Sequence, residues 1–189
     1  MDLLIEEAAR FQEFVIKNEW EFYFGGGLAV QIWGEPRLTR DIYLTIFTNF
    51  DNEPAFVDTI IAKYRPKYAD APKFALSERI LPVLTETGIT IDVALSGFSD
   101  LSESLERASY QHFFGDISLK VCSPDDLVVM KTLAGRSRDW PDVEAVLIKQ
   151  SNLDWEYIER SICQLFEYEQ EIEEKYCKLS LLKARHHRP

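Results

Sequence analysis

The chain has 189 residues, which is close to the usual size of one domain and too short for two full ones. Hydrophobic residues make up 46% of it, enough for a packed core, and this excludes a disordered protein. The formal net charge of −11 disfavours nonspecific coating of nucleic acid, because an acidic chain repels polyanions at long range, but a local basic groove stays open.

The N-terminal part of the sequence alternates between helical and extended patterns. Apolar residues at helical spacing predict an amphipathic helix over 3–18. A short aromatic strand over 21–24 runs into the triplet Gly25-Gly26-Gly27, and a helix over 28–33 starts directly on these glycines. Apolar and polar residues then alternate over 41–46, which predicts a strand.

The middle of the chain is predicted to contain, in order, a helix over 55–63, an irregular stretch over 64–78, and two strands over 80–84 and 89–95. Pro66 and Pro72 are the breakers of the irregular stretch. The turn Glu86-Thr87-Gly88 joins the two strands into a hairpin.

The remainder is predicted to be a helix over 101–108, a strand over 117–122, and then only helices. Ser123, followed by Pro124, starts a helix that stops at Gly135. We expect Asp139 to cap the next helix, which ends near residue 149. Asp154 is expected to cap a long last helix through about residue 174.

These elements predict the α+β fold class, with a small mixed sheet flanked by helices and a helical C-terminal third. We assign residues 1–122 to the α/β core and residues 123–189 to a helical region packed on it, as a single compact unit. No run approaches the roughly 20 apolar residues that span a bilayer, and the first residues are acidic where a secretory signal is basic. Three cysteines without CxxC spacing predict reduced thiols, so we expect a cytoplasmic protein with no membrane partner.

The segment that best indicates chemistry is the glycine triplet together with the strand after it. Glycines between a strand and a helix leave free N–H groups at a helix N-terminus, where a phosphate can bind; the alternative is a tight turn that needs a positive φ. Asp41 should leave the sheet on the same side as position 43, about 7 Å along the strand. A carboxylate there as well would make a pair able to hold two Mg²⁺ ions against a triphosphate. Asp92, on another predicted strand, is a further candidate ligand, unless it faces solvent.

These features resemble the nucleotidyltransferase superfamily. The resemblance is carried by Gly26-Gly27-Leu28-Ala29, the segment from Trp33 to Ile42, Asp92, and the segments 123–131 and 135–144. Within the superfamily, the chain is most similar to the AbiEii-type toxins of bacterial toxin–antitoxin pairs and their relatives, over roughly residues 20–160.

The resemblance implies a nucleotidyltransferase-like fold, Mg²⁺ as cofactor and a nucleoside triphosphate as substrate. It implies that Gly26 and Gly27 bind the nucleotide phosphates and that Asp41 and Asp92 are catalytic metal ligands. It also implies that Lys131 contacts a phosphate during catalysis; the alternative is an exposed helix lysine.

Other implied positions are secondary. Arg40, with Arg37, would steer phosphates or form surface salt bridges, and Asp142 matches a polar position near the site. The implied partners are a cognate antitoxin protein and a tRNA 3′ end as acceptor. Lysines near the C-terminal end offer a contact for RNA or have no function.

One residue departs from the family pattern. Tyr43 stands where the second aspartate of the D-x-D strand is expected, and a neutral phenol is a poor ligand for Mg²⁺. The natural protein is then a pseudoenzyme, a slow enzyme that uses one metal ion, or an enzyme that a recent Asp-to-Tyr change has inactivated. We therefore predict a nucleotidyltransferase of low or absent activity, or an inactive nucleotide- or protein-binding module of the same fold. A plain structural domain is the third hypothesis.

Overall fold

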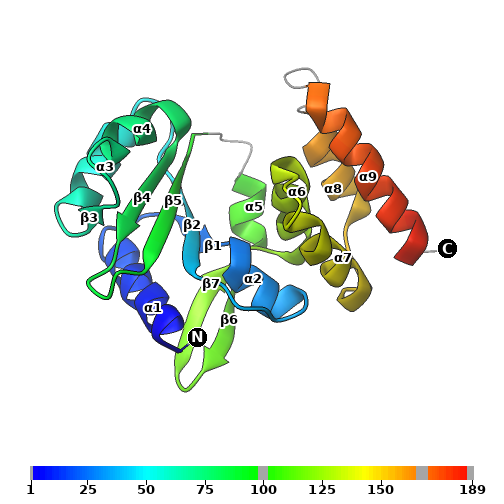
Figure 1. Cartoon of the computed structure of the whole chain (residues 1–189), viewed down its shortest axis with the longest axis horizontal. Helices are drawn as coiled ribbons and strands as arrows, with labels where there is room; N and C mark the ends of the chain where they lie inside the picture. The colour runs from blue at the N-terminus through cyan, green and yellow to red at the C-terminus, as the bar shows by residue number, and fades with distance from the viewer. Residues whose placement is uncertain (1, 98–101, 165–169, 187–189) are drawn as a thin grey trace. The chain divides into compact units, whose positions relative to one another are not determined.

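The computed structural model describes residues 2–97, 102–164 and 170–186, and it has the α+β architecture predicted from the sequence (Figure 1). Its elements in chain order are α1 (Asp2–Lys17), β1 (Phe22–Phe24), α2 (Gly26–Trp33), β2 (Asp41–Phe47), α3 (Glu53–Ile61), β3 (Arg65–Pro66), α4 (Ala71–Glu78), β4 (Ile80–Leu84), β5 (Thr90–Ser96), α5 (Ser102–Arg107), β6 (Ser109–Phe114), β7 (Ile117–Val121), α6 (Pro124–Ala134), α7 (Asp139–Lys149), α8 (Trp155–Cys163) and α9 (Gln170–His186).

All strands belong to one mixed sheet, in the order β3-β4-β5-β2-β1-β7-β6. The pairs β2–β5 and β1–β7 are parallel, and the other pairs are antiparallel. One face of the central strands is fully apolar and buried, as the period-two pattern of β2 predicted. Its side chains are Phe22, Phe24, Ile42, Leu44, Ile46, Ile91, Val93 and Leu95.

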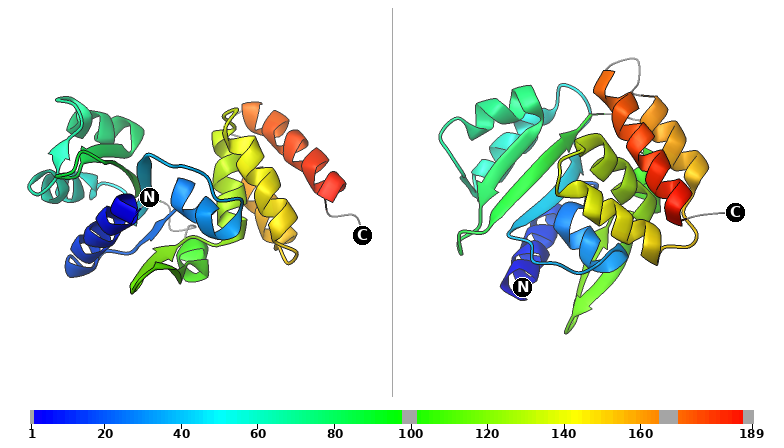
Figure 2. Two further views of the ribbon diagram at one scale, coloured as in Figure 1. Left: turned by 60° about the horizontal axis from the view of Figure 1, so that its bottom comes forward. Right: turned by 45° about the vertical axis from the view of Figure 1, so that its right-hand side comes forward.

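The chain forms two compact units, residues Met1–Leu28 with Leu38–Cys122, and residues Ala29–Arg37 with Ser123–Pro189. The second unit contains the end of α2 and the non-helical residues 34–37, and its helices α6 to α9 pack on one another (Figure 2). The sequence assigned the segment 29–37 to the first region, whereas here it belongs to the second unit.

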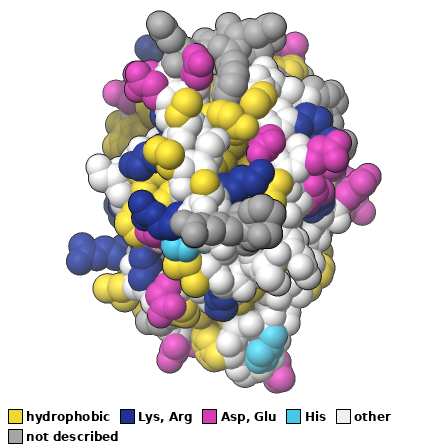
Figure 3. Space-filling view, turned by 90° about the vertical axis from the view of Figure 1, so that its right-hand side faces the viewer, with side chains coloured by type: hydrophobic (Ala, Val, Ile, Leu, Met, Phe, Trp, Pro, Cys, Tyr) yellow, Lys and Arg dark blue, Asp and Glu magenta, His cyan; other side chains and the backbone are white. Residues whose placement is uncertain are grey.

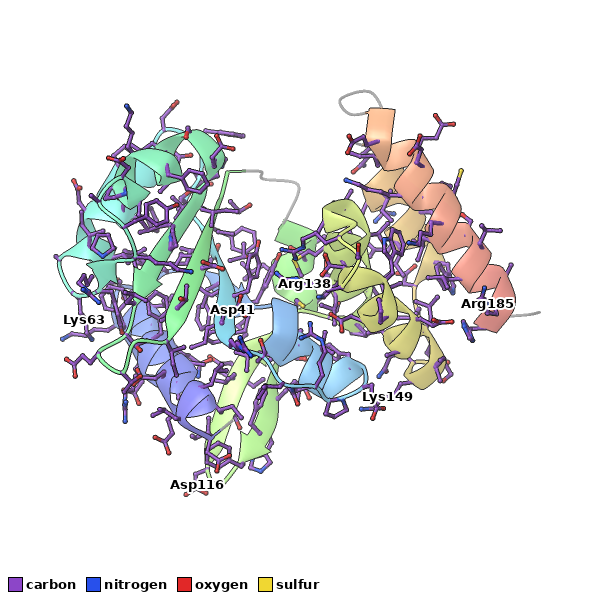
Figure 4. All side chains as sticks on the ribbon, viewed as in Figure 1. Asp41, Lys63, Asp116, Arg138, Lys149 and Arg185 are labelled. Carbon is purple, nitrogen blue, oxygen red and sulfur yellow. The ribbon has the colours of Figure 1, made fainter. Side chains whose placement is uncertain are left out.

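The C-terminal end of helix α7 explains this placement, because its last residue and its cap residue hold the segment 29–37. Lys149 Nζ (the residue is labelled in Figure 4) lies 3.2 Å from the carbonyl oxygen of Ile32 and 3.1 Å from that of Gly34. Gln150 Nε2 donates to the carbonyl oxygen of Trp33 at 2.9 Å. The last carbonyls of a helix lack intrahelical partners, so these two side chains cap the C-terminal end of α2.

The predicted irregular stretch over 64–78 is wrong, since it contains strand β3 and helix α4. Pro66 lies in β3, which is an edge strand of the described sheet and pairs with β4, and an edge strand tolerates a proline. Pro72 lies in the first turn of α4, where the missing N–H would have no partner in any case. The prediction also missed β6, an edge strand whose residues do not alternate between buried and exposed.

The caps of the C-terminal helices are mostly as predicted. Ser123 caps α6 by accepting from the Asp126 N–H at 3.0 Å, and Gly135 ends it with a φ of +62°. Asp154 caps the next helix by accepting from the Tyr157 N–H at 3.0 Å. The single last helix is wrong, because α8 ends at Cys163 and α9 is a separate helix. The residues 165–169 of that predicted helix lie outside the described ones.

Candidate functional site

The glycine turn joins β1 to α2 in the first unit. The Gly25 N–H donates to the carbonyl oxygen of Tyr43 at 3.0 Å, which ties the turn to β2. Gly26 has a φ of +56°, a conformation that costs glycine little, so the tight-turn interpretation holds for this residue. Helix α2 begins at Gly26, and the first N–H groups of a helix form a place where an anion can bind.

Neither Gly26 nor Gly27 has room for a side chain. A Cβ atom on Gly26 would lie 2.9 Å from Tyr43 Cβ, and one on Gly27 would lie 2.6 Å from Thr39 Cβ. Packing therefore requires both glycines whether or not a phosphate binds. The close approach also brings the start of α2 against the segment that carries Asp41.

The two candidate carboxylates lie on neighbouring strands. In the parallel register of β2 and β5, Tyr43 is opposite Asp92 and Asp41 is opposite Thr90. Paired residues share a face and residues two apart in a strand share a face, so Asp41, Tyr43 and Asp92 project from the same side of the sheet. Strand spacing and rise place the Cα atoms of Asp41 and Asp92 roughly 8 Å apart. Asp41 is labelled at the start of β2 in Figure 4.

This face also carries the contact with the glycine turn. The close approach of Gly26 to the Cβ atom of Tyr43 puts the turn on the side from which Asp41 and Asp92 project. Both aspartates are half-buried. The structure thus brings together four of the predicted site residues, Gly26, Gly27, Asp41 and Asp92; their roles stay predictions.

The donor set fits one divalent cation better than two. In the described part of the chain, no group of three or more Asp, Glu, His or Cys side chains is arranged to hold a metal ion. Asp41 and Asp92 supply two hard oxygen ligands, and Mg²⁺ is commonly held by one or two carboxylates together with water and substrate phosphates. Tyr43, between them on the same face, adds no carboxylate.

Arg40 and Thr39, which precede Asp41 in the chain, differ in their exposure to solvent. Arg40 is exposed, and its predicted role in phosphate steering stays a prediction. Thr39 is buried, and its hydroxyl Oγ1 lies 3.4 Å from Asp41 Oδ1. The sequence predicts no role for Thr39, because a single threonine gives no signal of a contact with the side chain two residues later.

Lys131 belongs to a buried ion-pair network in the second unit. Its Nζ atom lies 2.8 Å from Asp139 Oδ1 and 2.6 Å from Asp142 Oδ2. Arg37 donates to both oxygens of Asp142 at 2.7 Å, and Arg136 Nε donates to Asp139 Oδ2 at 2.7 Å. Lys131 is only 6% exposed, so the interpretation as an exposed helix lysine is wrong. Its contact with a phosphate stays a prediction.

The prediction of Asp139 as a helix cap is wrong. Arg138 is the cap residue of α7, and Asp139 is the first residue of the helix. Burial raises the pKa values of Asp139 and Asp142, but hydrogen bonds from Arg136, Arg37 and Lys131 outweigh burial. Both pKa values therefore lie below the usual range, and the two aspartates are ionised at neutral pH.

A groove of about 660 Å³ lies elsewhere in the first unit, along α1 and the segments 63–65 and 84–86. Burial, followed by the charges of Glu7 and Glu86, raises the pKa of Tyr64 at this groove to about 12. None of the predicted site residues lines it. The groove is therefore separate from the candidate site.

Two lysines of α9 make contacts within the second unit. Lys175 Nζ donates to the carbonyl oxygen of Leu133 at 2.8 Å, near the C-terminal end of α6. Lys178 lies over the ring of Trp140, with its Nζ atom 4.2 Å from the ring centre. Figure 3 shows Lys and Arg side chains interspersed with hydrophobic and acidic ones on one face of the molecule. These lysines have structural contacts that account for their positions without RNA.

Among the described residues, no helix has both the length and the apolar character needed to cross a membrane. Residues 53–187 match the family described as "Nucleotidyltransferase of unknown function (DUF6036)". This range includes Asp92 and Lys131, but it begins after the glycine turn and Asp41. No curated protein sequence matches the chain significantly.

Two solved structures share the fold over nearly the whole chain. One is an antigenic nucleotidyltransferase-like protein from Paracoccidioides brasiliensis, with a TM-score of 0.53 and 13% identity, over 93% of this chain and 92% of that one. The other is the antibiotic-resistance factor ANT(2'')-Ia, with a TM-score of 0.54 and 13% identity, over 96% of both chains. At this identity the similarity establishes the fold alone, which is nucleotidyltransferase-like.

Proposed function

Because the chain belongs to the nucleotidyltransferase family DUF6036, we propose that it is a metal-dependent nucleotidyltransferase whose activity is low as the sequence stands. The observation that carries the proposal is the common face of Asp41 and Asp92, beside the glycine turn at the start of α2. Carboxylates next to a helix N-terminus form a suitable place for a cation and a phosphate together.

In the proposed reaction, the glycines and the aspartates have separate roles. The backbone N–H groups at Gly26 and Gly27 bind phosphate oxygens, and Asp41 and Asp92 hold a divalent cation such as Mg²⁺. The cation, when bound, neutralises charge on the triphosphate. The acceptor oxygen forms a bond to the α-phosphorus, the bond from that phosphorus to the bridging oxygen of pyrophosphate breaks, and the hydroxyl proton passes to solvent. Positioning and charge neutralisation supply most of the rate.

Tyr43 is the reason to expect low activity. Two dications about 4 Å apart repel by roughly 17 kcal/mol at an effective dielectric constant of 20, before hydration is counted. Anionic ligands must offset this repulsion, and a tyrosine in place of a carboxylate removes one of them. The site as it stands therefore favours a single cation.

A more specific proposal concerns the biological role of the protein and its partners. We propose that the protein is the toxin component of a two-gene system, with a cognate antitoxin as partner and a tRNA 3′ end as acceptor. The similarity of the Gly26-to-Ile42 segment and Asp92 to AbiEii-type toxins supports these assignments. A cytoplasmic location follows from the same proposal.

The test is transfer of label from α-labelled nucleoside triphosphates to bulk tRNA in Mg²⁺. We compare the natural chain, Tyr43→Asp, and the double variant Tyr43→Asp/Asp41→Asn. We expect much faster transfer by Tyr43→Asp than by the natural chain or the double variant, because of these three only Tyr43→Asp has the full carboxylate set. Transfer by the double variant at the same rate would refute the role of Asp41.

A second candidate is an inactive module that binds a nucleotide or a protein. The observation that favours it is Tyr43 itself, which occupies the central position of the face between the two aspartates. In the same experiment, triphosphate binding by both the natural chain and Tyr43→Asp, with transfer by neither, indicates the module. Absence of triphosphate binding in both excludes the enzyme and the nucleotide-binding module, and it leaves a protein-binding module or a structural domain.

A further inference from the structure

We propose that Thr39 is a positioning residue, which orients the carboxylate of Asp41 for metal binding and sets the separation between that carboxylate and the glycine turn. This inference rests on the proposed function, because it assumes that Asp41 is a metal ligand. It concerns a residue that neither the sequence motifs nor the family similarity assigns.

The first support is the contact of the Thr39 hydroxyl with Asp41. Oγ1 lies 3.2 Å from the carbonyl oxygen of Asp41 and 3.4 Å from its carboxylate oxygen Oδ1. The hydroxyl has one proton to donate, and both acceptors belong to the same residue. In the part of the chain that the structure describes, Oδ2 of Asp41 has no such contact, so this oxygen faces no competing donor.

The second support is the packing of the same side chain on the glycine turn. A Cβ atom on Gly27 would overlap Thr39 Oγ1 and would lie 2.6 Å from Thr39 Cβ and 3.2 Å from Cγ2. All three side-chain atoms beyond the backbone thus face the first turn of α2. Thr39 is 8% exposed, so water has little access to its hydroxyl.

Together these contacts make Thr39 the link between the two halves of the site. Its methyl and Cβ rest on Gly27, which sets how closely α2 approaches, and its hydroxyl limits the rotation of the Asp41 carboxylate. Orientation matters more here than in a site with three carboxylates, because the described face carries two predicted carboxylate ligands, Asp41 and Asp92. Groups that hydrogen-bond a metal ligand commonly change metal affinity by 10- to 100-fold when they are removed.

The experiment measures Mn²⁺ affinity by electron paramagnetic resonance without nucleotide, in the natural chain and in Tyr43→Asp. In each background we compare Thr39→Val, which loses the hydroxyl, with Thr39→Ser, which keeps it. Thr59→Val is the matched control, because Thr59 lies on α3 and its hydroxyl donates to the Ala55 carbonyl oxygen of the same helix, at 2.8 Å. Asp41→Asn identifies the Mn²⁺ signal that belongs to this site.

We expect Thr39→Val to weaken Mn²⁺ binding by on the order of tenfold, and Thr39→Ser and Thr59→Val to stay within about threefold of their parent. Circular dichroism establishes that each variant is folded. If Thr39→Val does not fold, Thr39→Ala takes its place, because alanine also lacks the hydroxyl and is smaller.

Two results would overturn the inference while the proposed function stands. In one, Asp41→Asn abolishes Mn²⁺ binding but the variants without the hydroxyl bind like their parent. In the other, Thr39→Ser loses as much affinity as Thr39→Val, so that packing alone matters. Failure of Mn²⁺ to bind even to Tyr43→Asp contradicts the proposed function, and the role of Thr39 falls with it.

Discussion

Replacing Lys131 with methionine should destabilise the protein by about 3 kcal/mol, because the change leaves two buried carboxylates short of a cation. Methionine keeps the length and apolar character of the lysine stem, so packing along helix α6 is nearly preserved. What is lost is the ammonium group between Asp139 and Asp142, at 2.8 and 2.6 Å.

The magnitude follows from the number of contacts and their burial. A hydrogen bond to a charged group contributes about 1.5–3 kcal/mol net, and Lys131 makes two of them. The side chains of Asp139 and Asp142 are 0% and 4% exposed, so water cannot replace the ammonium. Arg136 and Arg37 remain as partners, which keeps the loss near the lower end of the 3–6 kcal/mol that two such bonds give.

The assay is urea unfolding followed by far-UV circular dichroism, together with thermal unfolding. For a chain of this size, about 3 kcal/mol corresponds to a decrease in Tm of roughly 6–12 °C. Lys73→Met is the matched control, because Lys73 is exposed on α4 and its replacement should change stability by less than about 0.5 kcal/mol.

A loss below about 1 kcal/mol would refute this reasoning, since it would mean that the two arginines alone satisfy the carboxylates. Equal losses of stability in Lys131→Met and Lys73→Met would also refute the reasoning.

Three further predictions concern pH, the glycine turn and a helix cap. The lowered pKa values of Asp139 and Asp142 give stability that is present above the unfolded pKa of about 3.9 and is lost as the pH falls through the folded values. The difference between the natural chain and Lys131→Met in urea should therefore be constant near neutral pH and shrink as the pH falls below the unfolded pKa of about 3.9. Gly26→Ala should cost about 2–4 kcal/mol by the same measurement, because strain at positive φ adds to a steric overlap. Ser123→Ala should cost about 1 kcal/mol through loss of the α6 cap, seen as a lower urea midpoint.

Each of these predictions has its own comparison. Gly88→Ala changes a glycine of φ +82° with nothing within 4 Å of the added methyl, so it should cost less than Gly26→Ala. Equal costs would show that the overlap at Gly26 is relieved by movement of β2. Ser123→Thr should restore most of the α6 cap, because threonine keeps the hydroxyl that accepts from the Asp126 N–H and donates to Asp126 Oδ2. A stability loss in Lys131→Met that does not change with pH would contradict ionised carboxylates in the network.

Sequence patterns were most informative where the signal is local. Ser123 and Gly135 marked both ends of α6, since capping depends on residues within one turn. The period-two pattern of β2 placed Asp41 and position 43 on one face, and the pairing with β5 put Asp92 on that face as well. Pro72 misled the prediction, because a breaker in the interior of a helix is a favourable residue in its first turn.

The sequence alone could not predict features that depend on contacts between residues far apart in the chain. Arg37 and Asp142 are 105 positions apart, and their pairing exists only once α7 and the segment 29–37 are folded together. Asp139 has the sequence context of a cap, yet tertiary contacts with Lys131 and Arg136 decide what its carboxylate does. The role inferred for Thr39 likewise required the packing on Gly27 to be seen.

Because residues 29–37 belong to the second unit, their place in the chain limits how this protein can be divided into fragments. A protease cut or a gene truncation after Cys122 yields a C-terminal piece without the peptide that Lys149, Gln150 and Asp142 bind. The N-terminal piece would carry that peptide with its polar groups deprived of their partners. The two fragments would therefore complement one another when mixed, and studies of the helical third by itself would need the nine-residue peptide supplied in trans.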